Sequence, residues 1–107
     1  MPSRWIDVGA AADLASQRPL AAQADDYSVL VVSCANGIFA IENRCTHDGE
    51  ALSGGEVEDC EIICPRHFAR FDLKSGEALT PPAYEPVRTF NVRIETGRIL
   101  VEMPADG

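Results

Sequence analysis

The chain places both of its histidines beside cysteines. Among its 107 residues are four cysteines and two histidines. Cys45 and His47 form a Cys-x-His motif, and Cys64 and His67 form a Cys-x-x-His motif after a gap of sixteen residues. Thiolate sulfur and imidazole nitrogen are common ligands for iron, copper and zinc. The two motifs therefore predict one metal centre that takes a cysteine and a histidine from each of two loops.

Other interpretations of these residues compete with such a centre. If the cysteines and histidines were neighbours only by chance, the position of both histidines beside cysteines would have no explanation. A tetrahedral zinc site with two cysteines and two histidines is chemically sound. However, zinc modules usually put at least two residues between paired ligands, and one residue separates Cys45 from His47. An all-cysteine cluster on Cys34, Cys45, Cys60 and Cys64 would leave both histidines unused.

Composition and charge exclude several classes of function. The chain is 46% apolar and 24% charged, as is usual for a globular domain, and its net charge is −8. We expect no binding to nucleic acid or to an anionic membrane, because no basic patch is present to neutralise phosphates. An acidic surface suits brief docking onto basic protein partners.

The sequence predicts no membrane segment and no targeting peptide. Charged residues interrupt Met1–Ala15, and the longest aliphatic run is Val29–Val32, far below the roughly 20 residues of a membrane-spanning helix. We therefore expect a cytoplasmic protein. Thiols stay reduced in that compartment, so spaced cysteines indicate metal ligands before disulfides.

The elements that must position the motifs are predominantly strands. Alternating and β-branched runs predict an all-β sandwich or small barrel. Gly9–Ser16 is expected to form one helical turn or a loop, and residues 42–57 and Thr80–Pro86 to be irregular. Asn36-Gly37 and Thr96-Gly97 are typical hairpin turns. The expected strands are Trp5–Val8, Pro19–Ala24, Tyr27–Cys34, Ile38–Ile41, Glu61–Ile63, Phe68–Asp72, Thr89–Glu95 and Arg98–Met103.

The two motifs, with their order and spacing, resemble the ligand motifs of the Rieske family. Cys45–Gly49 and Cys64–His67 are similar to that family's two cluster-binding loops, and Pro81-Pro82 is similar to its proline-containing third loop. The resemblance implies a Rieske-like antiparallel β fold over residues 1–107. It also implies a cluster-binding subdomain, at about residues 43–83, inserted between strands.

The resemblance also implies the cofactor and its ligands. One [2Fe–2S] cluster would be bound with Cys45 and Cys64 on an inner iron and with His47 and His67 on an outer, surface-facing iron. Thiolates are soft anionic ligands that suit the enclosed side of such a cluster. Neutral imidazoles tolerate exposure and give an electron a short route to a partner.

The residues beside the ligands predict a low reduction potential. High-potential Rieske proteins of cytochrome bc complexes carry one extra cysteine in each ligand loop, and these cysteines form a disulfide. The matching positions here are Glu50 and Arg66. Those proteins also place a serine and a tyrosine hydroxyl near the cluster sulfurs, where this chain has Ala69 and Phe71. Loss of those hydrogen bonds predicts a potential on the order of −150 mV.

The implied function is one-electron transfer without catalysis. The resemblance is nearest to stand-alone Rieske ferredoxins of bacterial ring-hydroxylating oxygenase systems. These pass electrons from an NAD(P)H-dependent flavin reductase to a terminal oxygenase. An alternative is the small Rieske-like subunit of an assimilatory nitrite reductase, and a further one is a zinc-binding module. We expect a monomer, in which Cys34 and Cys60 take no part in ligation.

Overall fold

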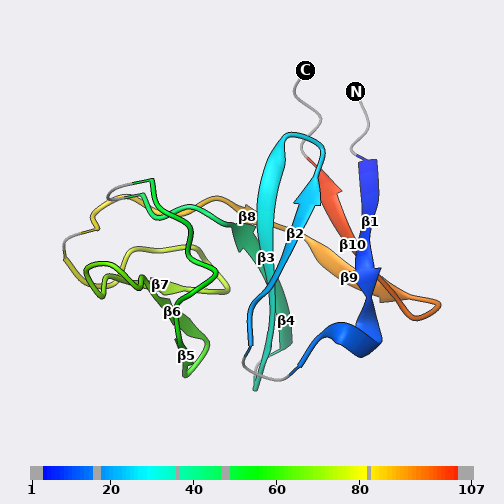
Figure 1. Ribbon diagram of the computed structural model, residues 1–107, viewed down its shortest axis with the longest axis horizontal. Coiled ribbons are helices and arrows are strands. Elements are labelled where there is room, and N and C mark those ends of the chain that lie inside the picture. Colours follow the sequence, from blue (N-terminus) through cyan, green and yellow to red (C-terminus); the bar gives the residue numbers. More distant parts are fainter. Residues whose placement is uncertain (1–3, 16–17, 36, 47–48, 82, 104–107) are drawn as a thin grey trace.

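The computed structural model describes residues 4–15, 18–35, 37–46, 49–81 and 83–103. Within these ranges the chain forms ten strands and one short 3₁₀ helix, η1 (Ala11–Asp13) (Figure 1). The strands are β1 (Arg4–Ala10), β2 (Leu20–Ala24), β3 (Tyr27–Cys34), β4 (Gly37–Glu42), β5 (Val57–Glu58), β6 (Glu61–Ile63), β7 (Arg70–Asp72), β8 (Thr89–Phe90), β9 (Val92–Glu95) and β10 (Arg98–Met103).

The strands build three antiparallel sheets, which confirms the predicted all-β class. Sheet A has the order β1-β10-β9, sheet B the order β2-β3-β4-β8 and sheet C the order β5-β6-β7. Sheet C lies in the segment between β4 and β8, residues 43–88, which we call the insertion. Figure 1 shows the insertion as a green and yellow lobe beside sheets A and B.

Sheet B is the middle layer of the molecule, because both faces of β3 are buried. Val29 and Val31 pack with residues of sheet A such as Ile99 and Val101. Their neighbours along the strand face the other way and pack with the insertion. Leu30 and Val32 belong to a buried cluster with Ile41 of β4 and with Ile62, Phe71 and Leu73 of the insertion. A strand covered on both sides reads as a continuous apolar run, which explains the sequence of β3.

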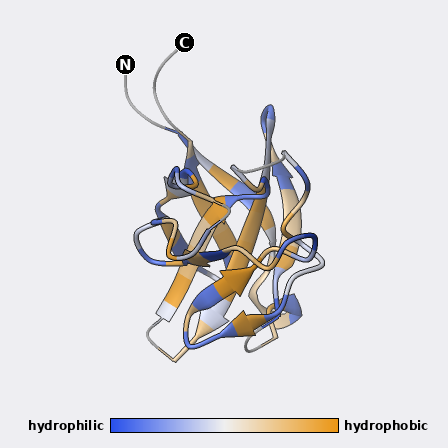
Figure 2. Ribbon diagram, turned by 90° about the vertical axis from the view of Figure 1, so that its left-hand side faces the viewer, coloured by the Kyte–Doolittle hydropathy of each residue, from blue (hydrophilic) through white to orange (hydrophobic). Residues whose placement is uncertain are grey.

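The insertion is apolar inside and polar outside. Figure 2, in which the insertion faces the viewer, shows orange strand segments surrounded by loops with blue stretches. Arg70 on β7 ties the three short strands together. Its side chain donates to Glu61 on β6 at 2.8 Å and to Glu58 on β5 at 3.2 Å, and these hydrogen bonds raise the pKa of Arg70.

Most predicted strands are present, but one was predicted wrongly. The alternating run Thr89–Glu95 is divided at Asn91, so that β8 joins sheet B and β9 joins sheet A. The Asn91 side chain donates to the carboxylate of Glu102 at 2.9 Å, and its carbonyl accepts from the Glu102 amide at 2.9 Å. The chain thus changes sheets at a residue whose polar groups are bonded to β10.

The turns agree with the sequence in one case and differ in another. Thr96 and Gly97 have φ of 49° and 76° and connect β9 to β10 as predicted. In the β3–β4 hairpin, Cys34 pairs with Gly37, so Gly37 belongs to the strand and not to the turn as predicted. Asn36 is outside the described residues. Strand β5 lies at the end of the segment expected to be irregular, and with two residues it is too short to show a period.

Candidate metal centre

The first candidate ligand loop is closed by its own backbone. The Cys45 amide donates to the carbonyl of Glu50 at 2.7 Å, and the Gly49 amide donates to the carbonyl of Cys45 at 2.8 Å. Gly49 has φ of 77°, a left-handed conformation that glycine adopts without strain. A Cβ atom at Gly49 would meet only the Arg44 side chain, at 3.8 Å. Backbone conformation, rather than lack of space, is therefore the reason for glycine here.

The second loop repeats this closure. The Cys64 amide donates to the carbonyl of Ala69 at 2.7 Å, and the Phe68 amide donates to the carbonyl of Cys64 at 2.9 Å. Phe68 holds the place of Gly49 and has φ of 64°. Its side chain is 71% exposed. A bulky apolar residue in this conformation and at this exposure is uncommon.

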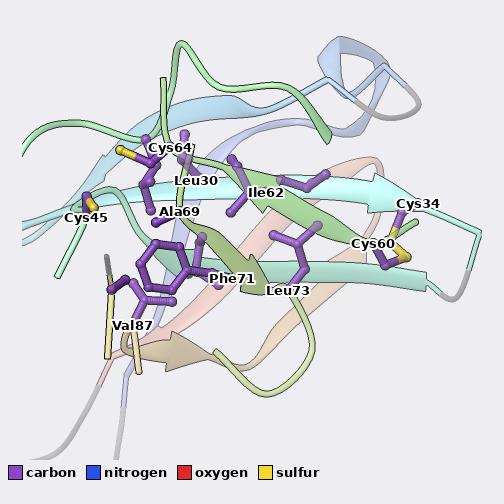
Figure 3. Close-up of a cluster of buried hydrophobic side chains, with 14 residues drawn as sticks. Leu30, Cys34, Cys45, Cys60, Ile62, Cys64, Ala69, Phe71, Leu73 and Val87 are labelled. Atoms are coloured by element: carbon purple, nitrogen blue, oxygen red, sulfur yellow. A yellow bond between two sulfur atoms is a disulfide. The ribbon is translucent and has the colours of Figure 1, made fainter. Parts of the chain in front are cut away.

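The two loops bring the predicted cysteine ligands to one end of a buried cluster. Cys45 and Cys64 are both fully buried, and neither is part of the disulfide. Both pack in the apolar cluster between sheet B and the insertion. Figure 3 shows them at the same end of this cluster, beyond Ala69 and Phe71.

His67 lies near its cysteine in the chain but on the outside of the molecule. It is exposed in the turn that follows Cys64. His47 lies outside the described residues. Among the residues that are described, no three histidine, cysteine, aspartate or glutamate side chains are close enough to bind one metal ion. The set of four ligands therefore stays a prediction, which we take up below.

Two contacts near the loops were not foreseen from the sequence. The Thr46 hydroxyl donates to the carbonyl of Glu85 at 2.7 Å and joins the first loop to the proline-containing segment. An ion pair between Arg66 and Glu50 joins the two ligand loops, with N and O 3.6 Å apart. By the resemblance described above, these are the positions at which high-potential Rieske proteins form their disulfide. Here an exposed ion pair occupies them.

Two glycines allow the backbone to pack closely within the insertion. A Cβ atom at Gly55 would lie 2.0 Å from the carbonyl oxygen of Ile63, next to Cys64. One at Gly76 would lie 2.2 Å from the carbonyl oxygen of Val87. The Val87 amide in turn donates to the Gly76 carbonyl at 2.8 Å. A single sequence does not reveal glycines with this role, because nothing in it distinguishes them from glycines in turns.

The other two cysteines correct the sequence interpretation. Cys34 and Cys60 were expected to be separate thiols, but they form a disulfide with Cα atoms 5.6 Å apart. This bond removes the all-cysteine cluster from the possible interpretations. Contact between residues 26 positions apart could not be deduced from the sequence, since cysteine spacing does not define disulfide pairing.

The donors present fit an iron–sulfur group of mixed ligation. Two buried thiols supply soft, anionic ligands, and an exposed imidazole lies close in sequence to one of them. Ala69 and Phe71 beside the thiols are both fully buried and carry no hydroxyl group. Their side chains therefore cannot donate hydrogen bonds to a group bound there.

Comparison with known proteins identifies the family. The model of the Rieske [2Fe-2S] domain matches residues 4–91, and the chain belongs to this family. The ferredoxin component of the naphthalene 1,2-dioxygenase system of Pseudomonas putida is 31% identical over 103 residues, which are 96% of this chain and 99% of that protein. The match confirms a Rieske-type [2Fe–2S] cofactor and an electron-carrying role in place of catalysis.

Solved structures agree with this assignment. The ferredoxin of carbazole 1,9a-dioxygenase from Nocardioides aromaticivorans IC177 has a TM-score of 0.86 and 32% identity, with 91% of this chain and 95% of that chain covered. A second ferredoxin, from a complex with the oxygenase of carbazole 1,9a-dioxygenase, has a TM-score of 0.84 and 26% identity, with 91% of both chains covered.

The fold is also shared with a protein of the alternative class. The structure described as a putative NADH-dependent nitrite reductase small subunit from Mycobacterium tuberculosis has a TM-score of 0.86 at 24% identity. The match covers 99% of this chain and all of that one. At this identity the likeness concerns the fold alone.

The described part of the chain contains no helix with the length and apolar character needed to cross a membrane.

Proposed function

We propose that the chain carries one electron at a time from a flavin-dependent ferredoxin reductase to a terminal oxygenase, such as an aromatic-ring dioxygenase. Cys45, His47, Cys64 and His67 would bind the cluster. The observation that carries this proposal is the pair of matched loops. Each begins with a buried thiol and contains one of the chain's two histidines two or three residues later.

The cysteines and the histidines would have different roles at the cluster: the cysteines hold it, and the histidines connect it to the surface. When bound, a [2Fe–2S] cluster accepts and releases one electron. Cys45 and Cys64 would hold it on the enclosed side, where burial keeps water from the thiolates. His67 lies at the surface, so that a partner can approach within a short distance. Its imidazole, together with that of His47, would be the exit for the electron.

The surroundings of the thiols favour a low potential. No hydroxyl from position 69 or 71 stabilises the added negative charge of the reduced state. We therefore expect a midpoint on the order of −150 mV, at the lower end of the Rieske range. A redox titration with a midpoint above zero would exclude this assignment.

Partner docking would use the exposed face of the insertion. Phe68 and Tyr84 are 71% and 81% exposed, and both lie in or next to the loops that surround the thiols. Exposed aromatic side chains with an acidic protein around them suit transient contact with a basic, partly apolar surface. Both partners would dock here in turn.

We also propose the arrangement of the whole protein. Residues 1–107 would form a single domain, with a cluster-binding subdomain at about residues 43–83. The protein would be a cytoplasmic monomer. Size-exclusion chromatography with light scattering tests the monomer directly, and limited proteolysis that cuts near residues 43 and 83 would support the subdomain.

The decisive experiment is spectroscopic. Protein purified without added metal should be reddish-brown, contain two irons per chain and bleach on addition of dithionite. His67→Ala should lose the colour. A colourless protein that contains one zinc ion would refute the proposal. With a ferredoxin reductase and NADH, the coloured protein should be reduced in steady state.

The alternative function is a subunit of nitrite reductase, and only the shared fold with such a subunit favours it. The two functions differ in partner. Copurification with a large sirohaem protein would support the alternative. Reduction by a ferredoxin reductase, with onward transfer to a dioxygenase, would support the carrier.

A further inference from the structure

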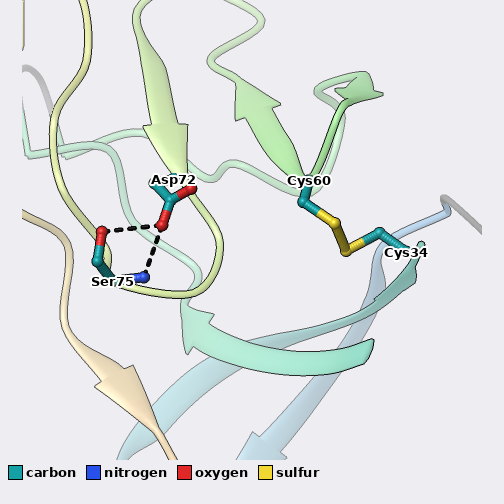
Figure 4. The surroundings of a disulfide bond; sticks show 4 residues. All are labelled: Cys34, Cys60, Asp72 and Ser75. Atoms are coloured by element: carbon teal, nitrogen blue, oxygen red, sulfur yellow. Dashed lines mark hydrogen bonds between the residues drawn. A yellow bond between two sulfur atoms is a disulfide. The ribbon is translucent and has the colours of Figure 1, made fainter. Parts of the chain in front are cut away.

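The disulfide joins two different sheets. Cys34 is the last residue of β3 in sheet B, and Cys60 lies in the two-residue turn between β5 and β6 in sheet C. Figure 4 shows the bond at the junction of these elements, near the turn that Asp72 and Ser75 close by hydrogen bonds. The bond therefore fastens the insertion to the middle layer of the molecule.

The backbone at Cys60 indicates that its sulfur is needed. Asp59 and Cys60 form the turn with φ of 52° and 59°. Glycine and asparagine are strongly preferred in such turns because other side chains disfavour this conformation. A cysteine at this position opposes the local preference, and the bond to Cys34 is the interaction that it gains in return.

The bond acts on one end of the strand that leads to a predicted ligand. Strand β6 (Glu61–Ile63) connects Cys60 at one end with Cys64 at the other. Within β6, Ile62 is fully buried. The Cys60 carbonyl also accepts from the Leu73 amide at 2.9 Å. Fixing Cys60 to sheet B therefore limits how far Cys64 can move away from Cys45.

We propose that the Cys34–Cys60 pair is a thiol switch that controls how firmly the protein holds its cluster. The disulfide form braces the insertion, and the dithiol form releases β6 and speeds loss of iron. This inference rests on the proposed function, because it takes Cys64 as a ligand. It also gives a role to a bond that a reducing cytoplasm would not maintain by default.

Opening the bond requires a dithiol reductant of the thioredoxin class, and closing it again requires a disulfide oxidant that takes up two electrons and two protons from the thiols. One thiolate of the reductant attacks a sulfur of the pair, the S–S bond breaks, and a mixed disulfide forms. The second thiol of the reductant then displaces the protein thiol. Two electrons and two protons pass to Cys34 and Cys60, and the reductant leaves as a disulfide. The two sulfurs are nearly buried, with Cys34 9% and Cys60 6% exposed, but Ala35 and Asp59 beside them are exposed.

The test compares the two thiol states of the unaltered holoprotein. Anaerobic holoprotein is treated or not treated with a small dithiol and then alkylated, and mass spectrometry counts the labelled cysteines. Iron release to a chelator and the thermal midpoint are measured on both samples. We expect release about tenfold faster and a midpoint about 10 °C lower in the reduced sample.

Two variants make the comparison specific. In the Cys34→Ala/Cys60→Ala double variant, the dithiol should cause no further change, which separates the switch from direct attack on the cluster. Cys60→Gly suits the turn better than cysteine but cannot form the bond. It should therefore release iron as fast as the reduced protein. If Cys60→Gly is as stable as the oxidised protein, the bond has no bracing role.

The outcomes separate this inference from the proposed function. Equal release rates for the oxidised and reduced forms of a coloured protein would refute the switch alone. Labelling of Cys34 and Cys60 in protein purified under air would also refute it. Purified protein without iron would refute the proposed function instead. In that case the thermal midpoint of the two thiol states still shows whether the bond braces the fold.

Discussion

The two ends of β6 are held in opposite ways. At the Cys60 end, a covalent bond and a nearly buried environment join the insertion to sheet B. At the Cys64 end, the loops are held by backbone hydrogen bonds, one threonine hydroxyl and an exposed ion pair between Glu50 and Arg66. We call the Cys60 end the base of the insertion and the Cys64 end its tip. The base is fixed by a covalent bond, whereas the tip depends on contacts that are each weak.

This difference suits a protein that must hold a group firmly and still expose it. A ligand loop at the surface cannot be enclosed without blocking electron transfer, so it is held by exposed contacts that are each weak. The stability that positions the loops then has to come from the base. High-potential Rieske proteins, by the resemblance described above, place a disulfide at the tip, and here the disulfide lies at the opposite end.

Removal of a ligand should have the largest effect on the tip. We expect Cys64→Ser to abolish the cluster and to lower the thermal midpoint by more than about 10 °C, because metal binding and folding are coupled. Cys34→Ser should keep two irons per chain and bind them less firmly. Iron analysis and visible absorption measure both. A Cys64→Ser protein with full iron content would contradict the ligand assignment.

A glycine at the base should come next. Gly76→Ala places a Cβ atom 2.2 Å from the Val87 carbonyl oxygen, in a backbone with φ of 78°, and should reduce the free energy of unfolding by about 2–4 kcal/mol. Gly97 has nearly the same φ, 76°, but no atom within 4 Å of its Cβ position. Gly97→Ala should therefore cost only about 1 kcal/mol. Equal losses in urea unfolding would show that close packing at Gly76 is unimportant.

A single hydrogen bond at the tip should matter less. Thr46→Val removes the 2.7 Å bond to the Glu85 carbonyl and should destabilise the loop by about 1 kcal/mol. Iron release should accelerate severalfold, with the overall unfolding midpoint little changed. Thr46→Ser keeps the hydroxyl and should behave as the unaltered protein does. An identical rate for all three proteins would mean that this bond does not hold the first loop.

An exposed ion pair far from the insertion should have the smallest effect. The Arg98 guanidinium donates to Asp7 at 2.8 and 3.0 Å and lowers the pKa of that carboxyl group. Because the folded pKa is the lower one, the contribution is present above the unfolded value of about 3.9 and is lost as the pH falls through the folded pKa. Asp7→Asn should lower the midpoint by roughly 1–2 °C at pH 7, and this difference should shrink as the pH falls below the unfolded pKa of about 3.9. A constant difference across this range would exclude the ion pair as its cause.

The sequence was sufficient to predict the strands whose residues alternate between apolar and polar or form a continuous apolar run. The runs that became β3, β6 and β10 alternate or are continuously apolar, and their bounds were predicted correctly. The change of sheet at Asn91 was missed, because alternation continues across it. The two residues of β5 were missed for lack of length. The cysteine and histidine motifs indicated the family and its cofactor, since their order and spacing are specific.

The parts of the site that could not be predicted depend on contacts between distant segments. The disulfide joins positions 34 and 60, and the Thr46 hydroxyl reaches the carbonyl of residue 85. Nothing local marks either pair. The unfavourable φ of Cys60, which is the best clue to its use, is visible only in the folded chain.

The self-contained closure of the second ligand loop has a practical consequence for engineering. Its shape is set by two backbone bonds between residues 64 and 69, and Pro65 and Arg66 between them are exposed. Exchange of Pro65 should therefore leave the loop in place, and exchange of Arg66 should cost only its exposed ion pair with Glu50, which contributes little. A library varied only there, with the strands and thiols untouched, would be a direct way to redirect this carrier toward a different oxygenase.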